Sequence, residues 1–138
     1  TRFVTSWNLN KSRGAECAFS LFKRAKIFGS PKSIVTDGLP SYIEPVKNTF
    51  KGSSHIVVKD FTDDISNNLI ESFNKTFKSW YKKIKGFKSY DSANSLISNF
   101  IFYYNFIKAH SSLSNLTPAQ VCGINYTHHE KVNWFVKY

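Results

Sequence analysis

Residues 34–46 read IVTDGLPSYIEPV. The apolar residues at the start predict a buried strand that ends at Asp37, and Gly38 marks a turn. Pro40 stands where the first turn of a helix begins. A carboxylate at the end of a buried strand either caps the turn that follows it or forms half of an active site. The residues themselves leave both interpretations open.

Strands and helices alternate on both sides of this stretch. Strands are predicted at residues 1–9, 33–37 and 54–59. Helices are predicted from 12 to a stop at 29, over 41–50, from about 64 to 85, from about 92 to 107, and from the capping box that begins at Thr117. Strands that are joined through helices pair in parallel. The predicted fold class is therefore α/β, with a short, mostly parallel sheet flanked by helices.

The chain is strongly basic: 19 Lys and Arg oppose 9 Asp and Glu among 138 residues, for a net charge of +10. The length suits one domain, and 41% apolar residues favour a globular fold over disorder. A cluster of lysines comprises Lys75, Lys78, Lys82, Lys83, Lys85 and Lys88. Such a surface attracts polyanions, and nucleic acid is the leading candidate. No apolar run reaches the roughly 20 residues of a membrane span and the N-terminus does not resemble a signal peptide, so we expect a cytoplasmic, nucleoid-associated protein.

The long helix predicted from about residue 64 to 85 carries two stripes. At about 100° per residue, one stripe is apolar and predicts the core face: Ile70, Phe73, Phe77, Trp80, Tyr81 and Ile84. The other stripe holds one acid among amides and lysines: Asn67, Glu71, Asn74, Lys75, Lys78, Lys82 and Lys85. An ion pair with Lys75, four residues on, explains Glu71 in ordinary structural terms.

A functional interpretation requires Asp37 and Glu71 to act together. Ligands of open α/β sheets gather at the carboxyl ends of strands, where Asp37 is expected, and a helix that crosses there would bring Glu71 beside it. Two or three hard oxygen ligands suit Mg²⁺ or Mn²⁺, and a pair of such ions supports phosphoryl transfer. Lys75, Lys78 and Lys82 would then hold the DNA backbone along the same helix face.

Four segments in this order resemble the integrase-type core of DDE transposases. They are IVTDGLPSY at 34–42, NNLIESFNKTFK at 67–78, GFKSYDSA at 86–93, and FYYNFIKAHSSLSNLTPAQV at 102–121. The nearest group in pattern is the compact prokaryotic insertion-sequence transposases of family six and their archaeal relatives. The resemblance extends from the start of the chain to Gly123, and the Glu-x6-Lys helix motif and the Thr-Pro-Ala run are its more specific parts.

The resemblance implies an RNase H-like (integrase core) fold and two divalent ions, Mg²⁺ or Mn²⁺. It implies an enzyme that cuts the ends of a mobile element and joins the freed 3′-hydroxyl to target DNA. Asp37 resembles the second catalytic carboxylate and Glu71 the third, and both would be metal ligands. Lys78 resembles the basic residue that contacts DNA near the reactive end. Asn67 and Asn74 would contact DNA or orient Glu71.

The family's first catalytic Asp lies upstream of the segment that matches residues 1–7, and no Asp of this chain takes that place. We therefore expect the C-terminal part of a DDE catalytic domain, with a partial core at 1–123 that lacks its first strand and a tail at 124–138. This part by itself is expected to be inactive, and the intact parent to be a homo-oligomer.

Two other functions stay open. One is a non-catalytic basic DNA-binding or assembly module, which needs the lysines but not the acids. The other is an RNase H-like nuclease of different purpose. In the last matching run, Asn105 and His110 either lock the exit of a helix by hydrogen bonds or take part in the site.

Overall fold

The computed structural model describes residues 1–12, 14–58, 68–127 and 129–131. The chain divides into two compact units, one made of Thr5–Asn74 and the other of Thr1–Val4 with Lys75–Tyr138. The domain boundary predicted between residues 123 and 124 stays a prediction.

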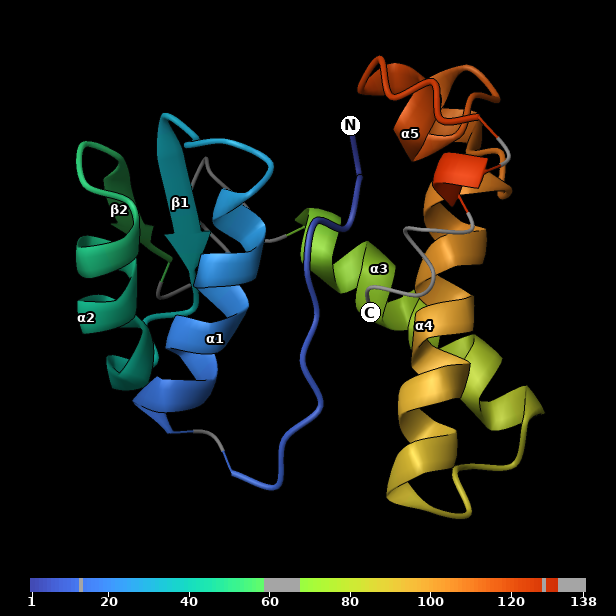
Figure 1. Ribbon diagram of the computed structural model, residues 1–138, viewed down its shortest axis with the longest axis horizontal. Helices are drawn as coiled ribbons and strands as arrows, with labels where there is room; N and C mark the ends of the chain where they lie inside the picture. The colour runs from blue at the N-terminus through green and yellow to red at the C-terminus, as the bar shows by residue number, and fades with distance from the viewer. Residues whose placement is uncertain (13, 59–67, 128, 132–138) are drawn as a thin grey trace. The chain divides into compact units, whose positions relative to one another are not determined.

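The unit Thr5–Asn74 is built around a parallel pair of short strands. Its elements are α1 (Ala15–Lys26), β1 (Ser33–Thr36), α2 (Pro40–Thr49) and β2 (Ser54–Val57), as Figure 1 shows. β1 and β2 pair in parallel, in a register that runs from Ser33 opposite Ser54 to Thr36 opposite Val57. Helix α2 is the crossover that parallel strands require. The predicted α/β class and parallel pairing are confirmed.

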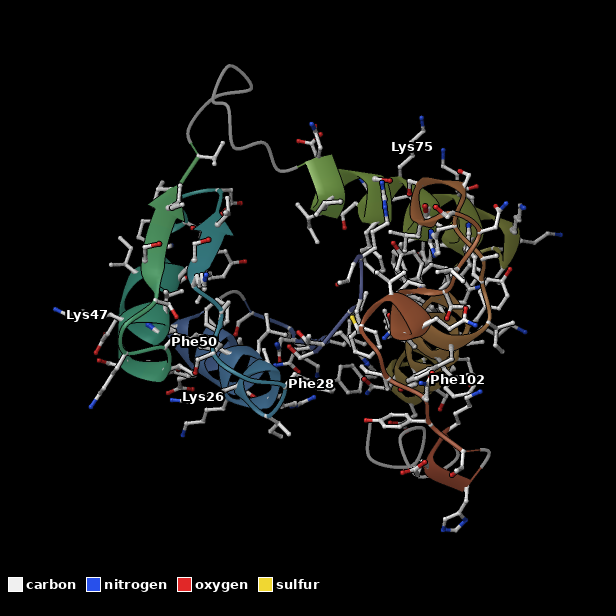
Figure 2. All side chains as sticks on the ribbon, turned by 90° about the horizontal axis from the view of Figure 1, so that it is seen from above. Lys26, Phe28, Lys47, Phe50, Lys75 and Phe102 are labelled. Atoms are coloured by element: carbon white, nitrogen blue, oxygen red, sulfur yellow. The ribbon has the colours of Figure 1, made fainter. Side chains whose placement is uncertain are left out.

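Helices α1 and α2 pack against each other through aromatic rings. The ring of Phe22 in α1 lies edge-on to Tyr42, at 6.1 Å between centroids, and to Phe50, at 6.0 Å. Lys26 Nζ donates a hydrogen bond of 2.6 Å to the carbonyl oxygen of Thr49, which ties the end of α1 to the end of α2. Figure 2 labels Lys26 and Phe50 at this junction. This packing holds the crossover helix, and hence the β1–α2 turn, in a fixed position.

The other unit is organised by α4 (Tyr90–Phe106). Its buried face includes Ala93, Ile97, Phe100, Ile101 and Tyr104. It continues into a 3₁₀ turn, η1 (Ser111–Leu113), and the short helix α5 (Pro118–Val121). The predicted capping box is confirmed, because Gln120 N donates to Thr117 Oγ1 and Thr117 N donates to the side chain of Gln120.

Helix α3 (Asn68–Lys83) packs on α4 through its C-terminal half. The rings of Phe77 and Trp80 contact that of Phe100, at centroid distances of 5.3 and 4.7 Å. Ile70 and Tyr81, which the apolar stripe assigned to the core, are 52% and 38% exposed, so that assignment is wrong for both residues. The predicted helix start near residue 64 lies outside the described residues.

The strand predicted at residues 1–9 is wrong, because these residues adopt no strand. A side chain takes the place of a neighbouring strand: Val4 N donates to Asn105 Oδ1, and Asn105 Nδ2 donates to the carbonyl oxygen of Val4, both at 2.9 Å. Asn105 is fully buried. An extended segment can thus satisfy its backbone without joining a sheet.

The exit of α4 is held by backbone bonds around His110. His110 N donates to the carbonyl oxygen of Leu116, and its ring lies 4.6 Å from that of Tyr104, edge-on. Burial lowers the pKa of His110, and the positive charges of Lys108 and Arg2 lower it further, against a backbone hydrogen bond that raises it. These contacts support the structural interpretation of Asn105 and His110, in which the two residues lock the exit of the helix.

The described part of the tail beyond Gly123 packs against α4. The ring of Tyr126 stacks on Phe106 at 5.6 Å. None of the helices in the described residues is long and apolar enough to cross a membrane.

Candidate active site and nucleic-acid interface

Asp37 follows β1 directly and its side chain is exposed. Its Oδ1 accepts a hydrogen bond of 3.3 Å from Leu39 N, which closes the turn between β1 and α2. The turn-capping interpretation of Asp37 is therefore confirmed. A carboxylate has about four acceptor positions, so this single bond leaves the group able to bind a cation as well.

Thr36 fixes the end of β1 just before Asp37. Its hydroxyl Oγ1 lies 2.9 Å from His55 Nε2 in β2 and accepts a longer bond, 3.4 Å, from Gly38 N. Its carbonyl oxygen accepts a hydrogen bond of 2.9 Å from Val58 N. The neighbouring strand thus holds both the backbone and the side chain of the residue that precedes the acid.

Gly38 is required by the turn for two reasons. Its φ of +78° lies in the left-handed region, and a Cβ at this position would lie 2.7 Å from Val57 Cγ1. A side chain at this position would adopt a strained backbone conformation and would require the Val57 side chain to shift. The Asp37-Gly38 pair is therefore a geometric unit: the glycine permits the close turn that leaves the acid at the strand end.

A hollow of about 340 Å³ opens beside Asp37. The residues that line it with polar side chains are Asn8, Asn10, Ser12, Cys17, Asp37 and Tyr42. Amide and hydroxyl oxygens suit a hard cation, and amide N–H and hydroxyl O–H groups can donate hydrogen bonds to a phosphate. Sequence reasoning missed the segment 8–12, although its run of Asn and Ser after Trp7 is the signal that would have drawn attention to it.

The acid and the basic residues predicted on one helix face are exposed along α3. Glu71 lies in the first turn described, and Asn74, Lys75, Lys78 and Lys82 follow, all exposed. Figure 2 shows Lys75 projecting away from the α3 ribbon. Asn67 lies outside the described residues. We call this set the Glu71 face.

Residues 62–118 match the family model of the integrase core domain. No curated protein and no solved structure matches the chain. The match covers less than half of the chain and includes the Glu71 face, α4 and the start of α5, but not Asp37. It supports an integrase or transposase catalytic domain, for which DNA is the substrate partner, and the two-stranded parallel α/β arrangement is consistent with its RNase H-like fold.

Asp37 and Glu71 are exposed carboxylates, and carboxylate oxygens are donors that fit a hard divalent ion. Residues 59–67, which connect β2 to α3, lie outside the described part of the chain. The binding of Asp37 and Glu71 to one ion stays a prediction. Within the described residues, no three His, Cys, Asp or Glu side chains gather in a way that would hold a metal.

Replacing Gly38 tests the constraint on the turn before Asp37. We expect Gly38→Ala to lower the free energy of unfolding by about 2–4 kcal/mol, from left-handed strain and the contact with Val57. Gly52→Ala is the matched control, because Gly52 has a φ of +94° but nothing near its Cβ position. It should lose only about 1 kcal/mol. Equal losses in urea unfolding of the two variants would show that the close contact is unimportant.

Proposed function

We propose that the chain forms part of the catalytic core of a DDE transposase of the insertion-sequence type. In this proposal the parent enzyme carries out metal-dependent DNA cleavage and strand transfer. The observation that carries the proposal is the integrase core match over a helix whose exposed face presents Glu71 among lysines.

The carboxylates of Asp37 and Glu71 are proposed to hold Mg²⁺ or Mn²⁺, two ions in the intact parent. When bound, such ions activate an attacking oxygen and stabilise the charge on a leaving one. The chain's own contribution is to fix the carboxylates. The Thr36 and Gly38 contacts orient Asp37 at the strand end, and the packing of Phe77 and Trp80 on Phe100 anchors the helix that carries Glu71.

The lysines of the Glu71 face are proposed to bind the DNA backbone. Lys75, Lys78 and Lys82 are exposed and recur at three- and four-residue spacing, so their ammonium groups project from the same side of α3. Each neutralises phosphate charge and releases counterions, which favours binding at low salt. Asn74 is exposed on the same face, and Asn67 and Asn74 are proposed to contact DNA or to orient Glu71.

We expect the 138-residue chain by itself to be inactive, because two carboxylates are too few to hold both ions. The test is a gel assay for cleavage of nicked or end-bearing duplex DNA with Mg²⁺ or Mn²⁺. No product is expected. Turnover that disappears in Asp37→Ala would refute this expectation, whereas turnover that survives the substitution indicates a contaminating nuclease.

A non-catalytic DNA-binding or assembly module is the second candidate, favoured by the basic surface, which does not need the acids. DNA affinity measured at fixed ionic strength with and without Mg²⁺ separates the two functions. The enzyme proposal predicts that Mg²⁺ strengthens binding and that Glu71→Gln removes this gain. Glu44→Gln is the matched control, since Glu44 is an exposed acid on α2.

A DNA affinity that ignores Mg²⁺ and rises on Glu71→Gln supports the module and contradicts the enzyme. The rise would follow from the removal of a negative charge from a basic face.

A further inference from the structure

A second hollow, of about 650 Å³, lies between α3 and the C-terminal half of α4. Its lining residues are Lys75, Thr76, Ser79, Trp80, Lys83, Phe100, Tyr103 and Lys108. Those on α3 come from the face next to the Glu71 face, and Lys75 belongs to both, whereas Phe100 and Tyr103 are on α4 and Lys108 follows it. We call this hollow the α3–α4 groove.

The α3–α4 groove is positively charged. Three of its eight lining residues are lysines, and none is an acid. Lys75 and Lys83 are exposed on α3, eight residues apart and so about 12 Å apart along the helix axis. Lys108 approaches from the other side, held by a 2.8 Å hydrogen bond from its backbone N to the carbonyl oxygen of Tyr103. The lysines therefore stand on both walls.

The groove also presents aromatic surface. Tyr103 is 47% exposed although it belongs to the helix that forms the core of its unit. Phe100 is buried beneath, and Trp80 packs on it at 4.7 Å between ring centroids, which fixes the indole. A fixed floor with an exposed ring beside it is a surface on which a flat, apolar group can stack.

We propose that the α3–α4 groove binds a single-stranded segment of nucleic acid, with a base stacked on Tyr103 and Trp80 and the flanking phosphates held by Lys75, Lys83 and Lys108. Aromatic rings interleaved with lysines are the pattern by which proteins hold single strands without reading their sequence. This inference rests on the proposed function in taking nucleic acid as the ligand, and it adds the strandedness of that ligand and a site that adjoins the Glu71 face.

The aromatic surface of the groove favours a single strand over a duplex as the ligand. Duplex bases are stacked within the helix, so a duplex approaches a surface mainly through its phosphates and sugars. Lysines alone would serve that purpose, and a ring exposed inside a hollow would add nothing. An unpaired base has a free face, and its stacking on an aromatic side chain is favourable whichever base it is.

The test is fluorescence anisotropy of the full 138-residue chain with a labelled oligo-dT single strand and with a hairpin duplex, both in EDTA. Tyr103→Ala should weaken single-strand binding by about fivefold or more, with Tyr103→Phe within about twofold of wild type, because the ring rather than the hydroxyl stacks. Duplex binding should be nearly unchanged in both variants. Circular dichroism checks that each variant is folded.

A charge pair tests the groove independently of Tyr103. Lys83→Gln with Lys108→Gln should lower the slope of log affinity against log salt for the single strand by about 1.4, at roughly 0.7 for each phosphate that is no longer neutralised. Lys32→Gln with Lys47→Gln removes the same charge from exposed sites near β1 and on α2 and should change the slope less. Figure 2 labels Lys47.

The proposal is overturned if Tyr103→Ala binds the single strand like wild type, or if both lysine pairs change the slope equally. Should Tyr103→Ala fail to fold, the two lysine pairs decide the matter. Because no divalent ion is present, the metal site of Asp37 and Glu71 does not enter. A chain that binds DNA without regard to Tyr103 refutes the groove alone, whereas a chain that binds no DNA refutes the proposed function with it.

Discussion

The close approach of β2 to Gly38 is the constraint on which the placement of Asp37 depends. Parallel pairing brings Val57 opposite Thr36, one residue before the acid, and a Cβ on Gly38 would lie only 2.7 Å from the Val57 side chain, which would have to shift. The chain turns directly after the strand, with Gly38 in the left-handed region, and Asp37 is left exposed at the strand's carboxyl end. The Asx turn to Leu39 orients the Asp37 side chain, and the hydrogen bonds of the Thr36 hydroxyl hold the residue before it. Structural and functional explanations of Asp37 are thus compatible, because the same turn that it caps also presents it.

Helix α3 has three faces, and Lys75 belongs to two of them. Phe77 and Trp80 anchor it to Phe100, although none of its described residues is fully buried. Glu71, Lys78 and Lys82 form an exposed face with one acid, and Lys75 and Lys83 line a neighbouring groove that has none. Because successive residues are about 100° apart around the helix axis, these faces point in different directions. One helix can therefore carry the acid proposed to bind a metal and the lysines proposed to contact nucleic acid, with no acid among the residues that line the groove.

Local patterns predicted the local structure well. The Asp37-Gly38 turn, the crossover helix and the Thr117 capping box follow from short-range preferences, and each is present. The prediction failed where a contact with a residue far away in the sequence determines the local structure. Residues 1–9 have strand-like composition, but Asn105, about a hundred positions away, satisfies Val4 in place of a second strand. The polar hollow beside Asp37 and the α3–α4 groove likewise depend on how helices pack, which no single segment encodes. The meeting of Asp37 with Glu71 is a long-range prediction of the same kind.

The binding of Mn²⁺ to wild type, Asp37→Asn, Glu71→Gln and the double variant tests the central claim most directly. Free Mn²⁺ is measured by electron paramagnetic resonance in titrations without DNA. If both carboxylates hold one ion, each single substitution should remove most of the affinity and the double variant should lose little more, because groups that share a ligand are strongly non-additive. Losses that simply add, or affinity that both single variants retain, would contradict the claim and leave a basic nucleic-acid-binding surface without a metal centre.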